Sequence, residues 1–184
     1  DVSVIRAPGQ VTTYADGPAI GPGGMTLRRV EVDGRAEGVR VSDKDRCGPM
    51  IIEDSFIRVV APDNCGGDWH GDSIQGYQGG PLTVRHSTVQ MTGMTAGCDG
   101  TSPLFYPRDQ GNTRIDVDNV LVIGGLYYAV RIGTPATVRG LYVVGGASLK
   151  CSLMESWQAY WAAIDSAYRV TATEPMPCSQ EDGA

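Results

Sequence analysis

Short segments with alternating apolar and polar residues recur along the chain. The first set consists of MTLRRVEV, MIIEDSFIRV, LTVRHSTVQM, TRIDVDNVLV and ATVRGLYVV, with equivalent apolar positions at Leu27, Ile52, Val84, Ile115 and Val138. Alternation with a period of two is typical of a β-strand that buries one side. Because the segments align in phase, they predict strands of successive repeats that stack on one another.

A second set of alternating segments lies between members of the first. These are EGVRVS, DSIQGY, SPLFYP and YAVRIG, with equivalent apolar positions at Val39, Ile74, Leu104 and Val130. Each repeat therefore holds at least two strands, and its length varies from about 23 to about 32 residues, which a β-helix accommodates in its loops. We predict an all-β fold, a right-handed parallel β-helix of about five coils over residues 1–150. An immunoglobulin-like or jelly-roll sandwich is the alternative, but antiparallel hairpins give no reason for in-phase alignment.

Polar residues interrupt the first set at equivalent places. The interruptions are Glu53-Asp54-Ser55, Arg85-His86-Ser87 and residues 116–119. Asp, Asn and Ser suit tight bends, because their side chains form hydrogen bonds with the nearby backbone. We therefore interpret His86 as a bend residue with a structural role.

The pattern changes after Val144. Apolar and aromatic residues then follow at near-helical spacing, at Leu153, Trp157, Tyr160, Trp161, Ile164 and Tyr168. This spacing predicts an amphipathic helix over residues 155–164, and the alternative is a pair of edge strands. Either element would form a cap over residues 151–178, because an open stack exposes unpaired backbone groups and apolar side chains. The polar tail, residues 179–184, is expected to be disordered.

Five cysteines without a C-x-x-C pair favour disulfides over a structural zinc site. Cys65 and Cys98 occupy the same place in neighbouring repeats, so a bridge between them is our first choice. Cys151 and Cys178 would then tie the cap down. Cys47 would stay unpaired, and a Cys47–Cys65 bridge is the competing pairing. Disulfides require an oxidising compartment, which predicts a secreted, extracellular protein.

Charge and hydropathy narrow the possible partners. The net charge of −6 disfavours nucleic acids, since phosphate binding requires a basic face. No apolar run approaches the roughly 20 residues of a membrane-spanning helix, so we expect no membrane partner. An anionic sugar is compatible with this charge, because a few arginines in one groove suffice to bind its carboxylates. We expect a monomer.

The second set of segments also predicts a stripe of outward side chains. If the equivalent apolar residues point inward, their chain neighbours point outward, and these are Arg40, Gln75, Phe105 and Arg131. Tyr77, Tyr106, Arg108 and Asp109 are expected on or beside this stripe, and the preceding loop adds Asp68, Trp69, His70 and Asp72. Together they predict a groove with aromatic rings for sugar stacking, guanidinium groups for carboxylates and an imidazole for proton transfer.

Several of these segments carry a family resemblance. The run Trp69-His70-Gly71-Asp72-Ser73-Ile74-Gln75, together with LTVRHSTV, SPLFYPRDQG and GGLYYAVRIG, resembles secreted bacterial right-handed β-helix proteins of the pectate-lyase-like superfamily with an H-x-D-x-x-Q signature. The resemblance covers residues 25–146 and implies the fold. That superfamily contains polysaccharide lyases, glycoside hydrolases, epimerases, esterases and non-catalytic tail fibres, so the fold does not imply one activity.

Lyases of that group often use calcium held by aspartates together with an Arg or Lys base, and this chain lacks a clear version of that pattern. A calcium site would draw on Asp63, Asp68, Asp72 and Asp99, because calcium prefers oxygen ligands from adjacent loops. We assign no metal ligand, and calcium is the one cofactor under consideration.

Three functions compete for the groove. A polysaccharide lyase would neutralise a uronate carboxylate with Arg40 or Arg131 and move protons with His70 or Tyr77. A glycoside hydrolase would need two carboxylates, for which Asp68, Asp72 and Asp109 are the candidates. A binding or adhesion module would use the same groove without chemistry. We favour the lyase on a uronic-acid-containing polysaccharide, with a catalytic group of His70, Asp72, Tyr77 and Arg131. The predicted substrate-binding residues are Arg40, Asp68, Trp69, Gln75, Phe105, Tyr106, Arg108 and Asp109.

Overall fold

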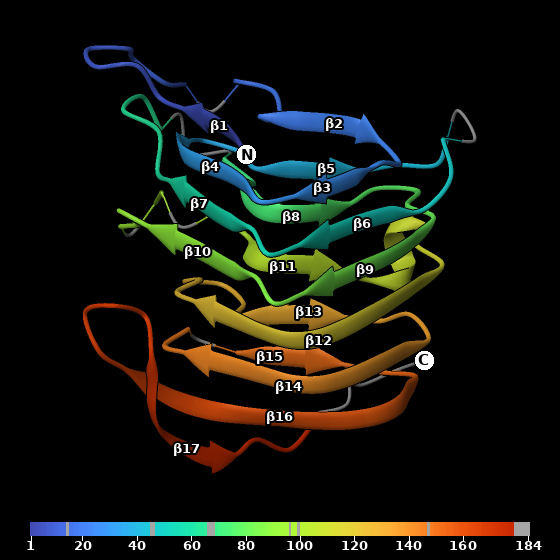
Figure 1. Ribbon diagram of the computed structural model, residues 1–184. Coiled ribbons are helices and arrows are strands. Elements are labelled where there is room, and N and C mark those ends of the chain that lie inside the picture. Colours follow the sequence, from blue (N-terminus) through green and yellow to red (C-terminus); the bar gives the residue numbers. More distant parts are fainter. Residues whose placement is uncertain are drawn as a thin grey trace.

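The computed structural model describes residues 1–13, 15–44, 47–65, 69–95, 97–98, 100–146 and 148–178. These residues form an all-β structure whose one short helical turn is the 3-10 turn η1 (Arg108–Gln110) (Figure 1). No helix in this part of the chain has the length and apolarity that crossing a bilayer requires.

The strands fall into three series, named here by one member each. The β5 series contains β2 (Ile20–Gly23), β5 (Val39–Val41), β8 (Asp72–Gly76), β11 (Ser102–Tyr106), β13 (Val130–Ile132) and β15 (Leu149–Cys151). The β6 series contains β3 (Thr26–Arg28), β6 (Met50–Glu53), β9 (Pro81–Arg85) and the first parts of the long strands β12 (Arg114–Ile123), β14 (Ala136–Val144) and β16 (Met154–Ile164). The β7 series contains β1 (Val2–Ile5), β4 (Val30–Arg35), β7 (Phe56–Val60), β10 (Thr88–Thr92) and the second parts of β12, β14 and β16.

Within each series the neighbouring strands pair in parallel. From β2 to β16 the chain passes through the β5, β6 and β7 series in turn and then returns to the β5 series, so each circuit lies directly on the previous one (Figure 1). This arrangement agrees with the predicted stacking of successive repeats and is consistent with a parallel β-helix.

The register confirms most of the predicted apolar ladders. Val39, Ile74, Leu104 and Val130 are register partners on adjacent strands, and each side chain is fully buried. In the other ladder Val84 pairs with Val117, so the expectation that Ile115 is its equivalent is wrong by two residues. A shift of two keeps the side chain on the inner side, and Ile115 is buried beside Leu82.

The bends between the β6 and β7 series lie where the polar interruptions predict them. Asp54, His86 and Asn119 have positive φ angles of 50°, 48° and 51°. Asp and Asn tolerate this left-handed conformation better than most residues, because their short side chains form local hydrogen bonds. Backbone pairing continues through the bend, since the His86 N–H donates to the Asp118 carbonyl. This position supports a structural role for His86.

The C-terminal segment contains strands rather than the predicted helix over 155–164. β16 pairs in parallel with β14 and in antiparallel with β17 (Val170–Pro175), so the alternative of two edge strands is the correct one. The edge of β14 offers a row of unpaired backbone groups, and satisfying them outweighs the near-helical spacing of the aromatic residues. The indole of Trp157 donates to the Met176 carbonyl (2.7 Å), which anchors the end of the hairpin.

Both first-choice disulfides are present, Cys65–Cys98 and Cys151–Cys178. Cys47 is an exposed free thiol, so the competing Cys47–Cys65 pairing is wrong. Two disulfides fit the predicted extracellular environment. The tail that was expected to be disordered, residues 179–184, lies outside the described residues.

Candidate functional site

The predicted outward stripe forms on the β5 series. Arg40 is the register partner of Gln75, Gln75 of Phe105, and Phe105 of Arg131. Lys150 continues the stripe on β15. Neighbouring strands lie about 4.8 Å apart, so the stripe places one side chain per strand along a line. Residues that are far apart in the sequence therefore meet on one face.

Two adjoining hollows open on this stripe. The first is lined by Arg40, His70, Gln75, Tyr77, Thr101, Phe105 and Gln110. The second is lined by Trp69, His70, Gly100, Thr101, Phe105, Tyr127, Tyr128 and Arg131. His70, Thr101 and Phe105 belong to both, so the two depressions are direct neighbours.

The Arg131 side chain is fixed by two aromatic rings and a carboxylate. Its guanidinium lies over the ring of Phe105 at 5.4 Å and over the ring of Tyr128 at 5.5 Å, measured to the ring centroids. Its Nη2 donates to the Asp109 carboxylate at 2.9 Å. The rings fix the plane of the guanidinium, and cation–π contacts of this kind stabilise it by about 0.5–1 kcal/mol each.

Arg40 is held at the other end of the stripe by two acceptors. Its Nε donates to Oε1 of Gln75 (3.1 Å), and its Nη2 donates to the carboxylate of Glu37. Burial raises the pKa of Glu37, and the neighbouring Arg40 charge opposes that rise. Arg40 therefore faces the groove with part of its charge already compensated.

Asp72 lies inside the fold rather than in the groove, contrary to expectation. Its side chain is fully buried, and Oδ1 accepts the Ser102 N–H at 2.8 Å. Oδ2 has no hydrogen-bond partner among the described residues. Burial raises the pKa of Asp72 well above its usual range, and the nearby Glu37 charge adds to the effect. Asp72 is thus an interior group that links β8 to β11, and it cannot touch a ligand on the surface.

Tyr106 also points inward, so its expected place on the stripe is wrong. The ring is fully buried, and the hydroxyl donates to the Gly80 carbonyl. Burial raises the pKa of this hydroxyl above its ordinary value. Gly79 leaves the space for the ring, because a Cβ there would lie 2.3 Å from the Tyr106 hydroxyl oxygen.

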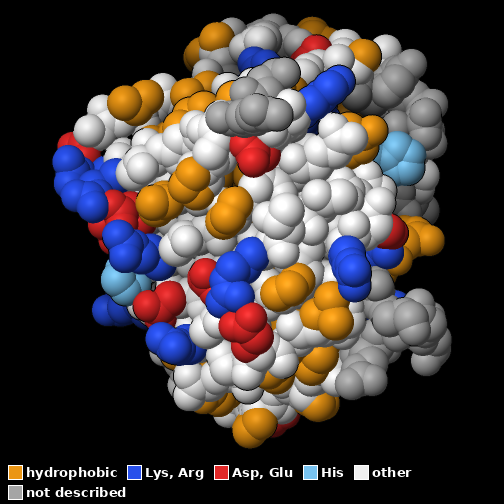
Figure 2. All heavy atoms as spheres, turned by 90° about the vertical axis from the view of Figure 1, so that its right-hand side faces the viewer, with side chains coloured by type: hydrophobic (Ala, Val, Ile, Leu, Met, Phe, Trp, Pro, Cys, Tyr) orange, Lys and Arg blue, Asp and Glu red, His pale blue; other side chains and the backbone are white. Residues whose placement is uncertain are grey.

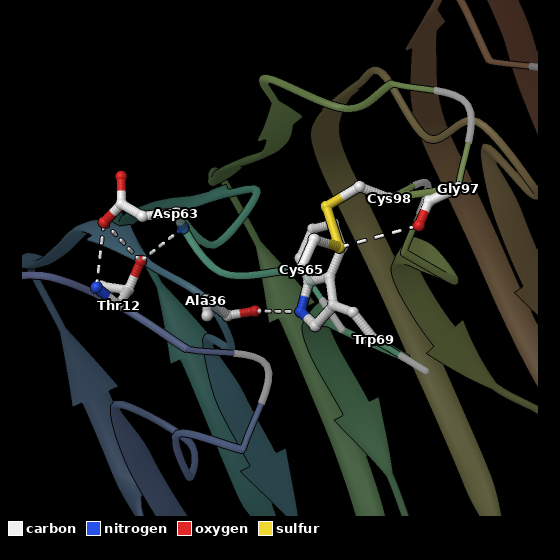
Figure 3. The surroundings of a disulfide bond; sticks show 7 residues. All are labelled: Thr12, Ala36, Asp63, Cys65, Trp69, Gly97 and Cys98. Atoms are coloured by element: carbon white, nitrogen blue, oxygen red, sulfur yellow. Dashed lines mark hydrogen bonds between the residues drawn. A yellow bond between two sulfur atoms is a disulfide. The ribbon is translucent and has the colours of Figure 1, made fainter. Parts of the chain in front are cut away.

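Trp69 has mainly a packing role. Its side chain is buried against the Cys65–Cys98 disulfide, and its indole N–H donates to the Ala36 carbonyl at 2.9 Å (Figure 3). Gly71 permits this arrangement, because a Cβ at that position would lie 2.2 Å from the indole nitrogen. Only the remaining surface of Trp69 reaches the second hollow, so it offers little ring face to a sugar.

The other predicted groove residues lie at the surface. His70 is exposed and lines both hollows, and Tyr77 is exposed beside the first. Asp109 is exposed in η1, and its carboxylate accepts a hydrogen bond from Arg131 of the stripe. Arg108 is exposed in the same turn and lines neither hollow. Asp68 lies outside the described residues.

The described residues do not fit the calcium site considered above. Asp63 accepts the Thr12 N–H at 2.9 Å (Figure 3). Asp63 also pairs with Arg6, and Asp72 is buried in the interior. Asp68 and Asp99 lie outside the described residues. Within the described part of the chain, no group of three His, Cys, Asp or Glu side chains is placed to hold a metal ion.

Cations on a second face are neutralised by carboxylates. On the β6 series Arg28 and Arg85 both pair with Glu53, and Arg114 pairs with Asp116 and Glu155. Basic and acidic side chains alternate along this face, at the left of Figure 2. Such cross-strand pairs stabilise neighbouring strands and leave little net positive charge for an anionic ligand.

The sequence reasoning missed Tyr128, Thr101 and Gln110 in the hollows and Glu37 behind Arg40. Tyr128 stands two residues before Val130 in GGLYYAVRIG, so its closeness to Arg131 was readable from the sequence. Glu37 opens the segment EGVRVS three residues before Arg40, so its closeness to Arg40 was readable as well. Thr101 and Gln110 come from the connections before and after β11, whose paths the repeat pattern does not define.

No protein-family model, no curated protein and no solved structure matches this chain.

Proposed function

We propose that this protein is a secreted polysaccharide lyase that binds a uronic-acid-containing glycan along the stripe from Arg40 to Lys150. The observation that carries the proposal is the Arg131 guanidinium held over Phe105 and Tyr128 at the floor of a hollow. A planar guanidinium suits a carboxylate, and the neighbouring rings suit the apolar faces of a sugar. The parallel strand stacking supports the accompanying fold proposal, a right-handed β-helix of the pectate-lyase-like superfamily with a C-terminal cap.

The charge pattern favours an acidic glycan. Although the net charge is −6, the stripe carries three cations in line, at Arg40, Arg131 and Lys150. Arg40 and Arg131 already pair with the carboxylates of Glu37 and Asp109, which an incoming polyanion would displace or share. An extended polyanion can therefore gain several charge-assisted hydrogen bonds along one face.

The proposed reaction is β-elimination. Arg131 binds the uronate carboxylate and makes the proton at C5 more acidic, and His70 removes that proton as the base. The electron pair of the C5–H bond forms the C4–C5 double bond while the bond from C4 to the glycosidic oxygen breaks. The leaving oxygen takes a proton from Tyr77 or from solvent. The products are a new sugar chain end and an unsaturated uronate, so atoms and charge balance.

Hydrolysis has less support from the described groups. It requires two carboxylates beside the scissile bond. Asp72 is buried, and Asp109 is engaged by Arg131. Asp68, the third candidate, lies outside the described residues.

The test is a continuous absorbance assay with polygalacturonate, alginate, hyaluronan and chondroitin, because the unsaturated product absorbs in the ultraviolet. We expect at least one of these polymers to give a rise in absorbance. His70→Ala should lower that rate by a factor of about 100 or more, in the range of a lost general base. Arg131→Ala should lower it similarly, and Arg139→Ala on β14 is the matched control that should leave it unchanged.

Two results would refute the proposal. New reducing ends without ultraviolet absorbance would indicate hydrolysis. Binding without products, unaffected in a folded His70→Ala variant, would indicate a non-catalytic adhesion module. Thermal melting of each variant separates lost chemistry from lost folding.

A further inference from the structure

A separate cleft lies on the outer side of the β7 series. Thr88, Leu121, Tyr142 and Tyr160 are register partners on β10, β12, β14 and β16, and their side chains line the cleft. The β16–β17 hairpin adds Tyr168, Val170 and Thr173 from the opposite side. Of the residues lining the proposed lyase groove, none belongs to this cleft.

The hairpin is fixed over this face rather than left free. The Tyr168 hydroxyl donates to Oε1 of Gln90 at 3.1 Å, across a sequence separation of 78 residues. The Tyr168 ring also meets Phe56 edge-on, with a centroid distance of 5.8 Å. Asp165 closes the turn by accepting the backbone N–H groups of Ala167 and Arg169. The cleft is therefore preformed, which lowers the entropic cost of binding a ligand there.

Aromatic rings form the walls of the cleft. Tyr142 and Tyr160 stack nearly parallel, with centroids 5.5 Å apart and ring planes 17° apart. Both rings are only partly buried, and Tyr168 is 37% exposed. Rings that could pack fully in a core instead keep accessible surface at a concave site, as ligand-binding aromatic residues do.

Most of the remaining lining residues are polar. His86, Ser87 and Asn119 stand at the bend side, and Thr88 and Thr173 add hydroxyl groups. None of the described lining residues is Lys, Arg, Asp or Glu. An anionic ligand would find no guanidinium or ammonium group among these lining residues to replace its lost hydration, which disfavours it. This chemistry contrasts with the cationic stripe on the β5 series.

We propose that this cleft binds a neutral pyranose unit of a polysaccharide. The apolar face of the sugar would lie on the tyrosine rings, and its hydroxyl groups would pair with the Ser, Thr, Asn and Tyr side chains. The protein thereby carries two glycan-binding surfaces of different charge preference on different faces. The inference does not depend on lyase activity.

The experiment measures binding of neutral hexasaccharides by NMR and calorimetry. The probes are cellohexaose, xylohexaose and mannohexaose, with hexagalacturonate as the charged comparison. We expect at least one neutral probe to bind with a Kd in the millimolar range or tighter and to shift the ring signals of Tyr142, Tyr160 and Tyr168. Tyr142→Ala should weaken that binding by about five- to tenfold, as expected for loss of one stacked ring.

Further variants separate ring stacking from folding. Tyr142→Phe keeps the ring and should retain most of the affinity, while Leu126→Ala removes an exposed apolar side chain outside the cleft and should leave it unchanged. The inference is overturned if no neutral probe binds at about 10 mM, a concentration at which a ligand with a Kd of about 1 mM would fill most of the sites. Undiminished binding to a folded Tyr142→Ala/Tyr160→Ala variant, or a preference of these rings for hexagalacturonate, would overturn it as well.

Discussion

Asp109 offers a sharp test of how the stripe binds a carboxylate. Its carboxylate accepts a hydrogen bond from Arg131 at 2.9 Å. A uronate that binds Arg131 must therefore displace Asp109 or share the guanidinium with it. Asp109→Asn removes the competing charge but keeps a side chain of the same shape. We predict that this variant binds acidic oligosaccharides more tightly than the unaltered protein.

The size of the expected gain in affinity follows from the solvent exposure of Arg131 and Asp109. The side chain of Arg131 is 20% exposed and that of Asp109 is 57% exposed, so water screens their attraction. Exposed ion pairs contribute about 0.2–1 kcal/mol, which corresponds to a gain in affinity by a factor of about 1.5 to 5. The stability of the folded protein should fall by no more than about 1 kcal/mol for the same reason.

Calorimetric titration with hexagalacturonate and hexaguluronate at fixed ionic strength measures the change. Asp116→Asn is the matched control, because it removes the same charge beside Arg114 on the β6 series. If the uronate displaces Asp109 from Arg131, Asp109→Asn should gain more affinity for the acidic hexasaccharides than this control does. Equal gains in affinity for the two variants would mean that only the net charge of the protein matters. Weaker binding by Asp109→Asn would mean that Asp109 itself contacts the sugar.

Three further predictions concern the fold. Asp72→Asn should raise the stability of the folded protein at neutral pH, because burial raises the pKa of Asp72 in the folded state. The contribution of Asp72 to stability is then complete only below its ordinary pKa near 3.8 and is lost as the pH rises through the folded-state pKa. Thermal melting at several pH values should show that the advantage of the variant grows from acid toward neutral pH, and a constant difference would contradict this. Replacing Cys151 and Cys178 by Ser should cost about 3.5 kcal/mol in urea unfolding, because their bridge closes a loop of 27 residues, whereas Cys47→Ser should change nothing measurable. Leu104→Ala should cost about 3 kcal/mol in the same assay, since the side chain is fully buried in the stacked core, and a loss below about 1 kcal/mol would argue against that packing.

The sequence predicted the stacking of the strands because the inward ladders carry a strong physical signal. Val39, Ile74 and Leu104 recur in phase, and in-register burial of such residues is what a stacked parallel sheet requires. The outward stripe then followed from strand alternation alone. The Cys65–Cys98 bridge followed from the same alignment.

Tyr106 and Asp72 were wrongly placed in the groove because their functional groups were given more weight than the alternation of side chains along a strand. Tyr106 lies two residues after Leu104, and Asp72 lies two residues before Ile74, so the period of two places both inside. Their functional groups suggested the groove, but side-chain direction in a strand follows position rather than polarity. Applying the alternation to every residue of β8 and β11 would have removed both from the predicted site.

Two features of the structure depend on contacts between segments far apart in the sequence, which the repeat pattern does not define. The β16–β17 hairpin forms because the edge of β14 remains available for pairing, a condition that depends on the whole stack. The pairing of Arg131 with Asp109 likewise depends on the path of η1 between two strands. Neither relation is encoded in local spacing.

The most direct test of the central claim is a crystal structure of the protein with a bound acidic hexasaccharide. We expect a uronate carboxylate on the Arg131 guanidinium, a sugar ring beside Phe105 and Tyr128, and the sugar chain running along the stripe toward Arg40. An acidic sugar bound on the paired charges of the β6 series or in the tyrosine-lined cleft, or no bound sugar at saturating concentration, would contradict it.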